Sequence, residues 1–109
     1  MTQATVAAHR IHDTAVRIAI SGEIDLANAD VVQRRILGVI TNQLTEVSVD
    51  LSGVTYIDSA GLRVLLRLGT RLETLQIALE LLVPPDSPTR RVIELSGMGE
   101  VASVRPTPD

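Results

Sequence analysis

Short apolar stretches recur along the chain and predict β-strands. In the second of them, Ile18 and Ile20 alternate with Arg17 and Ala19, the period of two that a half-buried strand shows. The fourth, residues 77–83, is apolar except for one glutamate, which is typical of a strand buried on both faces. The predicted strands cover residues 5–11, 16–20, 47–51, 77–83 and, at the end of the chain, 101–104.

Between these strands, apolar residues recur every three to four positions, which predicts amphipathic helices. In the first helix, Val32 and Ile36 lie on the predicted buried stripe, and Asn28 is the predicted N-cap. In the third helix, Ser87 is the predicted N-cap, followed by a proline at the first helical position. The predicted helices cover residues 26–42, 59–72 and 88–96.

The resulting order, β-β-α-β-α-β-α-β, predicts an α/β fold with a mixed sheet of four to five strands. The short turn at residues 12–14 favours an antiparallel hairpin at one edge, whereas helical crossovers make the later strands parallel. The length of 109 residues fits a single domain over residues 1–109. We expect loose termini at about residues 1–4 and 106–109.

The same topology brings two loops to one end of the sheet. Residues 21–25 and 52–59 follow the second and third strands, which are predicted to be parallel, and open α/β sheets place function at that end. His12 lies in the turn at the opposite end, roughly 17 Å away along a typical strand, so a triad with Ser59 is not expected. His9 is predicted to be a surface residue on the edge strand. We therefore predict no catalytic residue and no hydrolase chemistry.

Ser59 stands at the predicted start of the second helix. We interpret residues 52–53 as a break in the third strand, after which Tyr56 returns the chain to the interior and Asp58 or Ser59 caps the helix. Free backbone N–H groups and the positive dipole end of a helix favour an anion there. A phosphate on Ser59 would add about −1.5 to −2 charges at pH 7. The alternative interpretation is a simple capping serine, which contributes about 1 kcal/mol.

The composition narrows the classes of function. The chain has no cysteine and no lysine, which excludes disulfides, thiolate metal sites, Schiff-base chemistry and a lysine-containing phosphate loop. Its net charge is −3 and Tyr56 is its only aromatic residue, which argues against binding to nucleic acid. No apolar run approaches 18 residues, and the amino terminus lacks the apolar core of a signal peptide. We expect a cytoplasmic protein that is not an enzyme, with no metal, no cofactor and no membrane partner.

The sequence around Ser59 resembles the signature of STAS-domain proteins, specifically the anti-sigma-factor antagonists. The matching residues are 50–54 (DLSGV) and 57–62 (IDSAGL). The resemblance continues upstream at residues 21–25 (SGEID) and downstream at residues 88–92 (PTRRV), so it covers nearly the whole chain. It implies a STAS-type fold with the helices mainly on one side of the sheet.

The resemblance also implies a function. An unphosphorylated protein of this kind binds an anti-sigma factor, which is itself a serine kinase. It releases the anti-sigma factor when the serine corresponding to Ser59 is phosphorylated. A serine phosphatase reverses the modification. This partner exchange regulates sigma-factor-dependent transcription in bacteria. The residues that the resemblance and the topology assign to partner binding are Glu23, Asp25, Asn28, Asp58, Ser59, Gly61 and Arg63.

Several of these residues also have a simpler interpretation. Glu23 and Asp25 form an acidic rim or are ordinary solvated loop carboxylates. Arg63 pairs with a phosphate on Ser59, contacts an acidic partner, or belongs to a solvated arginine ridge with the two arginines that follow at four-residue spacing. Gly61 is expected to permit a close approach in the first helical turn.

Two other functions remain open from the sequence. One is a STAS subunit that scaffolds a signalling complex or senses a ligand. The other is a nucleotide-binding STAS domain, for which the sequence offers no phosphate loop.

Overall fold

The computed structural model describes residues 3–106 and follows the predicted order of elements. These are β1 (Ala4–His12), β2 (Ala15–Ile24), α1 (Ala29–Leu37), β3 (Glu46–Ile57), α2 (Ser59–Thr74), β4 (Ala78–Leu82), α3 (Arg90–Leu95), the 3-10 helix η1 (Met98–Glu100) and β5 (Ser103–Arg105). Residues 1–2 and 107–109, part of the termini predicted to be loose, lie outside the described residues. The prediction was wrong for Gln3 and Ala4. The Gln3 carbonyl accepts a hydrogen bond from the Glu23 N–H (3.0 Å), and Ala4 begins β1.

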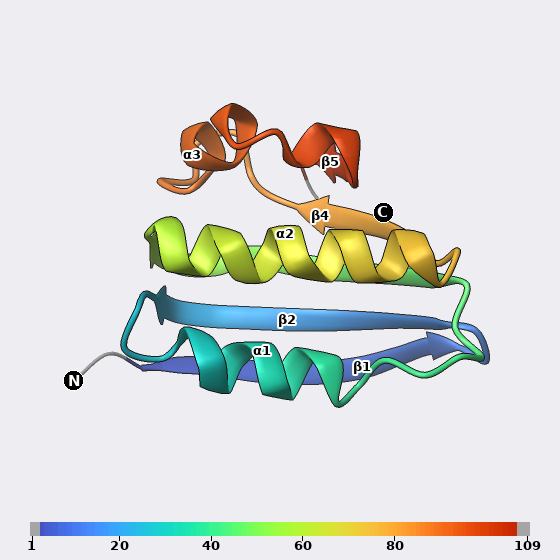
Figure 1. Ribbon diagram of the computed structural model, residues 1–109. Coiled ribbons are helices and arrows are strands. Elements are labelled where there is room, and N and C mark those ends of the chain that lie inside the picture. Colours follow the sequence, from blue (N-terminus) through green and yellow to red (C-terminus); the bar gives the residue numbers. More distant parts are fainter. Residues whose placement is uncertain (1–2, 107–109) are drawn as a thin grey trace.

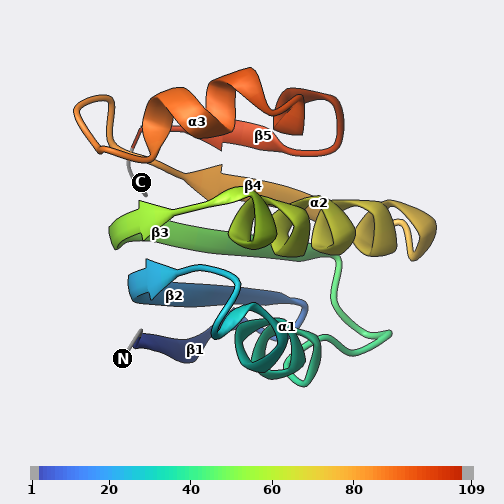
Figure 2. The ribbon, with the colours of Figure 1, turned by 60° about the vertical axis from the view of Figure 1, so that its left-hand side comes forward.

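The five strands form one mixed sheet in the order β1-β2-β3-β4-β5. The β1–β2 hairpin is antiparallel, and β2, β3, β4 and β5 run parallel to one another (Figures 1 and 2). This confirms the predicted hairpin at one edge and the parallel crossovers. The carboxyl ends of β2 and β3 therefore lie at the same end of the sheet.

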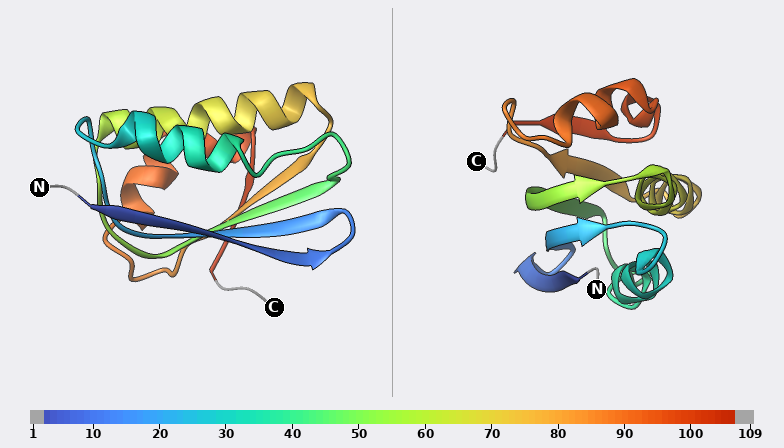
Figure 3. Two further views of the ribbon diagram at one scale, coloured as in Figure 1. Left: turned by 90° about the horizontal axis from the view of Figure 1, so that it is seen from below. Right: turned by 90° about the vertical axis from the view of Figure 1, so that its left-hand side faces the viewer.

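The helices lie on one side of this sheet. Helices α1 and α2 pack side by side over one face, and α3 lies beside them at the β4–β5 edge (Figure 3). The structure thus confirms the expectation that the helices lie mainly on one side of the sheet. No helix within residues 3–106 is long and apolar enough to cross a membrane.

The core fills the space between the sheet and the helices and is built from aliphatic side chains. Ile18, Val49 and Leu81 are completely buried on three neighbouring strands. Leu65 and Leu72 of α2 are also completely buried and belong to the same cluster. Each such side chain stabilises the fold by about 1.5–3 kcal/mol through removal of apolar surface from water.

The opposite face of the sheet is largely uncovered, which corrects one prediction. Strand β4 was expected to be buried on both faces, but Ala78 is exposed and Glu80 is half-buried. The Glu80 carboxylate pairs with the Arg105 guanidinium of β5 at 2.9 Å. The apolar run was a poor guide here because the helices lie on only one side of the sheet.

Strands β2 and β3 are longer than predicted. Residues 52–53 do not break β3; the strand continues to Ile57 beside β2, which continues to Ile24, with two shifts of register. A Cβ atom on Gly53 would lie 2.8 Å from the Ser21 Cβ, so the glycine allows the two strands to approach. Tyr56, predicted to return to the interior, is 50% exposed. The predicted loop is therefore an irregular part of a strand.

The predicted helix ends also needed correction. Helix α1 is shorter than residues 26–42 at both ends, and its N-cap residue Asn28 forms no side-chain capping bond. Helix α3 begins at Arg90 with Thr89 in the N-cap position; the Ser87 Oγ instead accepts a hydrogen bond from the Thr89 N–H (3.3 Å) in the preceding turn. The short last strand is confirmed, as β5, parallel to β4.

Candidate functional site

The loops that follow β2 and β3 are joined by direct hydrogen bonds. The backbone N–H of Asp58 donates to the carbonyl of Ile24 (3.2 Å). In return, the N–H of Leu26 donates to the Asp58 Oδ2 (3.2 Å). The segments that precede α1 and α2 therefore form one continuous surface, as the parallel arrangement of the strands predicts.

Asp58 is the N-cap of α2. Its Oδ1 accepts hydrogen bonds from the N–H groups of Ala60 (2.9 Å) and Gly61 (3.1 Å). Ser59 is therefore the first helical residue rather than the cap, which decides the alternative that the sequence left open. The sequence suggested that the backbone N–H groups at the start of α2 would be free to bind an anion, but the Asp58 carboxylate already accepts hydrogen bonds from two of them.

Replacing Asp58 tests this capping role. Asp58→Ala leaves two helical N–H groups and the Leu26 N–H without their acceptor, and we expect a loss of about 2 kcal/mol in the free energy of unfolding. Asp58→Asn keeps one oxygen and should lose less. Urea denaturation measures both, with the exposed Asp86→Ala as the control. Equal effects of the Asp58→Ala and Asp86→Ala substitutions would contradict the role.

The Ser59 side chain lies at the surface of the protein. Ser59 is exposed, and its Oγ forms no hydrogen bond with any residue that the structure describes. A hydroxyl that only capped the helix would instead accept a bond from an N–H of the first turn. The simple capping interpretation of this serine is therefore wrong.

Gly61 brings α2 close to the end of β2. A Cβ atom at this position would lie 2.6 Å from the Ile57 Cγ1 and 2.9 Å from the Ile24 carbonyl oxygen. Both distances are shorter than real Cβ contacts, so a side chain would displace the first turn of the helix. The expected close approach is confirmed, and it fixes the position of Ser59 relative to the loop before α1.

The loop before α1 is held by its own polar side chains. The Asn28 Oδ1 accepts from the Asp25 N–H (3.0 Å), and the Asn28 Nδ2 donates to the Glu23 carbonyl (2.8 Å). The Asp25 Oδ1 accepts from the Ala27 N–H (2.9 Å). Asn28 thus connects the end of β2 to the start of α1 and gives the loop a defined shape.

The predicted site residues contribute charge to this surface unequally. Glu23 is exposed, while Asp25 and Asp58 are half-buried. Arg63 is exposed on α2, one helical turn beyond Ser59. The residues assigned to this surface thus include three carboxylates and one guanidinium, a net negative charge.

The structure adds two residues that the sequence did not assign to this surface. Leu26 is 82% exposed, directly beside Asp58, and Tyr56 is 50% exposed near the end of β3. Tyrosine is enriched among the residues that contribute most binding energy in protein interfaces, whereas leucine is not and contributes mainly apolar area. The sequence placed Leu26 in a helix and Tyr56 in the interior, so their exposure became apparent only in the folded chain.

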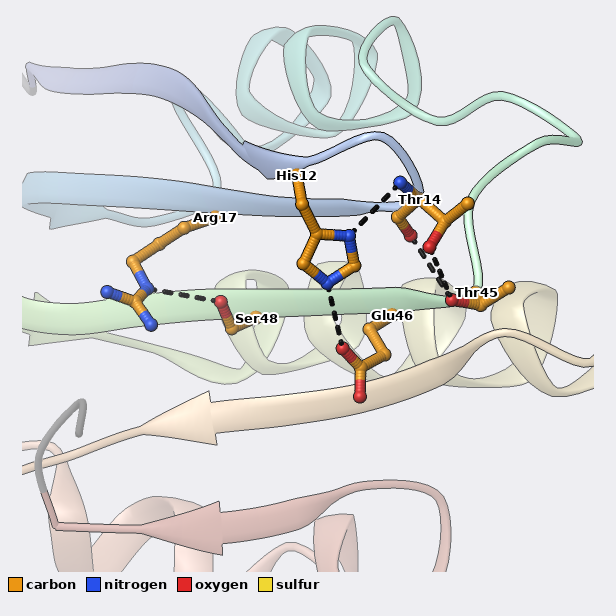
Figure 4. Close-up of polar contacts among 6 residues, drawn as sticks. All are labelled: His12, Thr14, Arg17, Thr45, Glu46 and Ser48. Carbon is orange, nitrogen blue, oxygen red and sulfur yellow. Dashed lines mark hydrogen bonds and ion pairs between the residues drawn. The ribbon is translucent and has the colours of Figure 1, made fainter.

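The opposite end of the sheet holds His12. Its Nε2 lies 3.9 Å from a Glu46 carboxylate oxygen, and its Nδ1 accepts from the Thr14 N–H (3.3 Å), as Figure 4 shows. Arg17 on the neighbouring strand donates to the Ser48 Oγ (3.2 Å; Figure 4). His12 is thus at the other end of the strands from Ser59, and no triad with it forms. Within residues 3–106, no group of His, Asp and Glu side chains is arranged to hold a metal ion.

A cavity of about 370 Å³ lies on the uncovered face of the sheet near this end. Glu46 and Glu80 contribute carboxylates to its lining, and Arg17 and Arg105 already have hydrogen-bonding partners there. It does not include Ser59. Its lining therefore carries two guanidinium groups and two carboxylates, and only Arg105 is paired with one of these carboxylates, Glu80.

The chain therefore forms a two-layer α/β domain. Ser59, the first residue of α2, lies beside the ordered acidic loop that precedes α1. The STAS domain family model matches residues 6–109, and the chain belongs to this family. A search of the curated proteins gives no match.

Solved structures of similar proteins include anti-sigma factor antagonists. One from Mycobacterium paratuberculosis is 27% identical with a TM-score of 0.83, over 96% of this chain and 87% of that one. The Bacillus protein SpoIIAA is 22% identical and matches 92% of this chain in two structures. Its unphosphorylated form has a TM-score of 0.70 over 87% of that chain, and its phosphorylated form has a TM-score of 0.66 over 90% of that chain. The murine anion transporter solute carrier 26 family member A9 is 14% identical with a TM-score of 0.76, over 99% of this chain but only 21% of the transporter.

Proposed function

We propose that this protein is an anti-sigma-factor antagonist that operates by partner switching in the bacterial cytoplasm. Unphosphorylated, it binds an anti-sigma factor that is also a serine kinase, and so frees the sigma factor. Phosphorylation of Ser59 by that kinase ends the binding, and a serine phosphatase restores it. The observation that supports this most directly is the exposed Ser59 hydroxyl beside the ordered loop of residues 25–28.

The charge around Ser59 supports such a switch. A phosphate adds about −1.5 to −2 charges at pH 7, on a surface that already carries Glu23, Asp25 and Asp58. The Asp58 carboxylate occupies two N–H groups that would otherwise stabilise the phosphate. A partner surface suited to a neutral hydroxyl and these carboxylates would therefore meet an added negative charge, which Arg63 alone among the assigned residues could offset. A penalty of about 2.7 kcal/mol already weakens binding about a hundredfold.

The partner-binding surface consists of both loops and the start of α2. Its polar members are the residues assigned from the sequence, and Leu26 and Tyr56 add exposed apolar area. Likeness to the antagonist from Mycobacterium paratuberculosis over 96% of this chain supports the proposal, as does likeness to SpoIIAA, a protein solved in two phosphorylation states.

The other functions considered have less support. A STAS domain that serves as a subunit of a larger assembly agrees with the likeness to part of a murine transporter, at 14% identity. Nucleotide binding would require a site for phosphate. The cavity of about 370 Å³ on the uncovered face holds Arg17 and Arg105, but it also holds the Glu46 and Glu80 carboxylates, and Glu80 already pairs with Arg105. Neither possibility accounts for the exposed, unpaired Ser59 hydroxyl.

The test uses Ser59→Ala as bait in lysate of the native cell, followed by mass spectrometry of the captured proteins. We expect a serine kinase that also binds a sigma factor. Incubated with ATP, this kinase should transfer one phosphate to the wild-type protein at Ser59 and none to Ser59→Ala. Phosphate at another residue, or continued labelling of the variant, would overturn the assignment of the switch residue.

A further inference from the structure

The two long helices expose a cluster of arginines on a protein that is acidic overall. Helices α1 and α2 contain five arginines, all exposed, and only two carboxylates, Asp30 and Glu73. They carry a net charge of +3 in a chain whose total is −3. Within residues 3–106, none of the five forms an ion pair with a carboxylate. They are Arg34, Arg35, Arg63, Arg67 and Arg71.

A hollow of about 170 Å³ lies between α1 and α2, and two of these arginines, Arg67 and Arg71, line it. The two helices lie side by side on the outer surface of the molecule (Figure 3). Residues of both helices line the hollow. Its floor is aliphatic and its rim is polar. The floor is formed by Ile36, Leu37, Val64 and Leu68, and the rim by Gln33, Arg67 and Arg71.

The rim has a defined geometry. Arg67 and Arg71 are four residues apart on α2, a separation of about 6 Å along the helix axis. The Arg67 Nη1 reaches across to the Gln33 Oε1 of α1 at 3.4 Å, which holds the guanidinium over the junction. Gln33 is neutral, so this contact leaves the charge of Arg67 uncompensated.

We propose that this groove between α1 and α2 binds an acidic amphipathic helix of a partner protein. An aliphatic side chain of the partner fills the hollow, and two carboxylates, four residues apart on the same helix, pair with Arg67 and Arg71. The spacing of the carboxylates equals that of the arginines because both follow the same helical repeat. This is a helix-in-groove mode of recognition. Ser59 is not among the residues that line the groove, so binding there should not depend on whether Ser59 is phosphorylated.

The groove fits a protein better than other polyanions. Nucleic acid would use aromatic side chains for stacking, and the only aromatic residue, Tyr56, is not among the lining residues. A membrane surface would require exposed apolar side chains beside Arg67 and Arg71, whereas the aliphatic residues here form the floor of a recess. The exposed Val31 lies beside Arg34 and Arg35, outside this hollow. An aliphatic floor with a cationic rim instead matches one apolar side chain flanked by carboxylates.

The probe is a synthetic helical peptide of about 18 residues, long enough to form a helix, with a leucine stripe flanked by glutamates at four-residue spacing. Titration into the full-length ¹⁵N-labelled protein is followed by NMR. We expect chemical-shift changes centred on Ile36, Val64 and Arg67. The double variant Arg67→Glu/Arg71→Glu should bind at least about tenfold more weakly. Raising the salt to about 1 M should weaken binding to the wild type, because the Debye length falls to about 3 Å.

Two controls distinguish a specific groove from general attraction to anions. Arg10→Glu/Arg91→Glu makes the same change in charge at exposed residues outside the groove and should bind as the wild type does. A peptide of the same composition in scrambled order should bind at least about tenfold more weakly.

Three results would overturn the proposal. The first is no saturable binding of the peptide. The second is equal loss of affinity in the two double variants. The third is stronger binding to phosphatidylglycerol vesicles or to an RNA oligonucleotide than to the peptide, which would identify the surface as a site for membrane or nucleic acid.

Discussion

Ser59→Asp should bind the anti-sigma factor at least about tenfold more weakly than Ser59→Ala, and the phosphorylated protein about a hundredfold more weakly. The reason is electrostatic. Ser59 is exposed beside Asp58, whose carboxylate already accepts two N–H groups of the first helical turn. A new negative charge therefore finds these two N–H groups already occupied and must be desolvated against the partner. The exposed Arg63, one turn along α2, is the only cation among the residues assigned to this surface. Isothermal titration calorimetry with the purified partner measures the difference.

Control variants show whether the loss of affinity depends on the position of the substitution or only on the added charge. Ser103→Asp introduces the same charge at an exposed serine of β5 and should leave the affinity unchanged. Leu26→Ser should weaken binding because it removes an exposed leucine next to Asp58, whereas Ile11→Ser, near the opposite end of the sheet, should not. If Ser59→Asp and Ser59→Ala bound equally, the charge-based switch would be refuted.

Gly61→Ala should lower the free energy of unfolding by about 2 kcal/mol, although alanine is intrinsically the better helix former by about 1 kcal/mol. The added Cβ would lie 2.6 Å from the Ile57 Cγ1 and 2.9 Å from the Ile24 carbonyl oxygen. The backbone oxygen has little freedom to move, so the first turn of α2 must shift. That shift carries Ser59 away from the loop of residues 25–28, and partner binding should weaken as well.

Gly99→Ala is the control for this substitution. A Cβ at Gly99 meets no atom within 4 Å, so its stability should stay within about 0.5 kcal/mol of the wild type. Urea denaturation followed by circular dichroism measures both variants. A Gly61→Ala protein as stable as Gly99→Ala would show that the helix end accommodates a side chain.

Much of the architecture could be predicted from local patterns. Alternation such as that of Ile18 and Ile20 indicated the strands, and the helices between them required parallel crossovers. From that order alone, the loops that lead into α1 and α2 had to share one end of the sheet. The position of the site was therefore predictable without any knowledge of side-chain contacts.

The errors arose where contacts between distant residues decided the local structure. Residues 52–53 are a serine and a glycine, which suggested a break in the strand, but β3 continues through them and Gly53 pairs with Ser21 of β2. The apolar run of β4 suggested burial on both faces, but one face of the sheet has no helical layer over it at Ala78. In both cases the outcome depended on a neighbour that local sequence does not identify.

The sequence by itself determined the order of the elements, the aliphatic core and the end of the sheet at which Ser59 lies, because periodicity and connectivity are properties of the chain. Only the tertiary structure decided that Asp58 rather than Ser59 caps α2, that Leu26 is exposed, and that Arg67 stands over an apolar groove. These features depend on which groups meet when separate segments pack together. Hydrogen bonds and van der Waals contacts act over a few ångströms in space, whatever the separation along the chain.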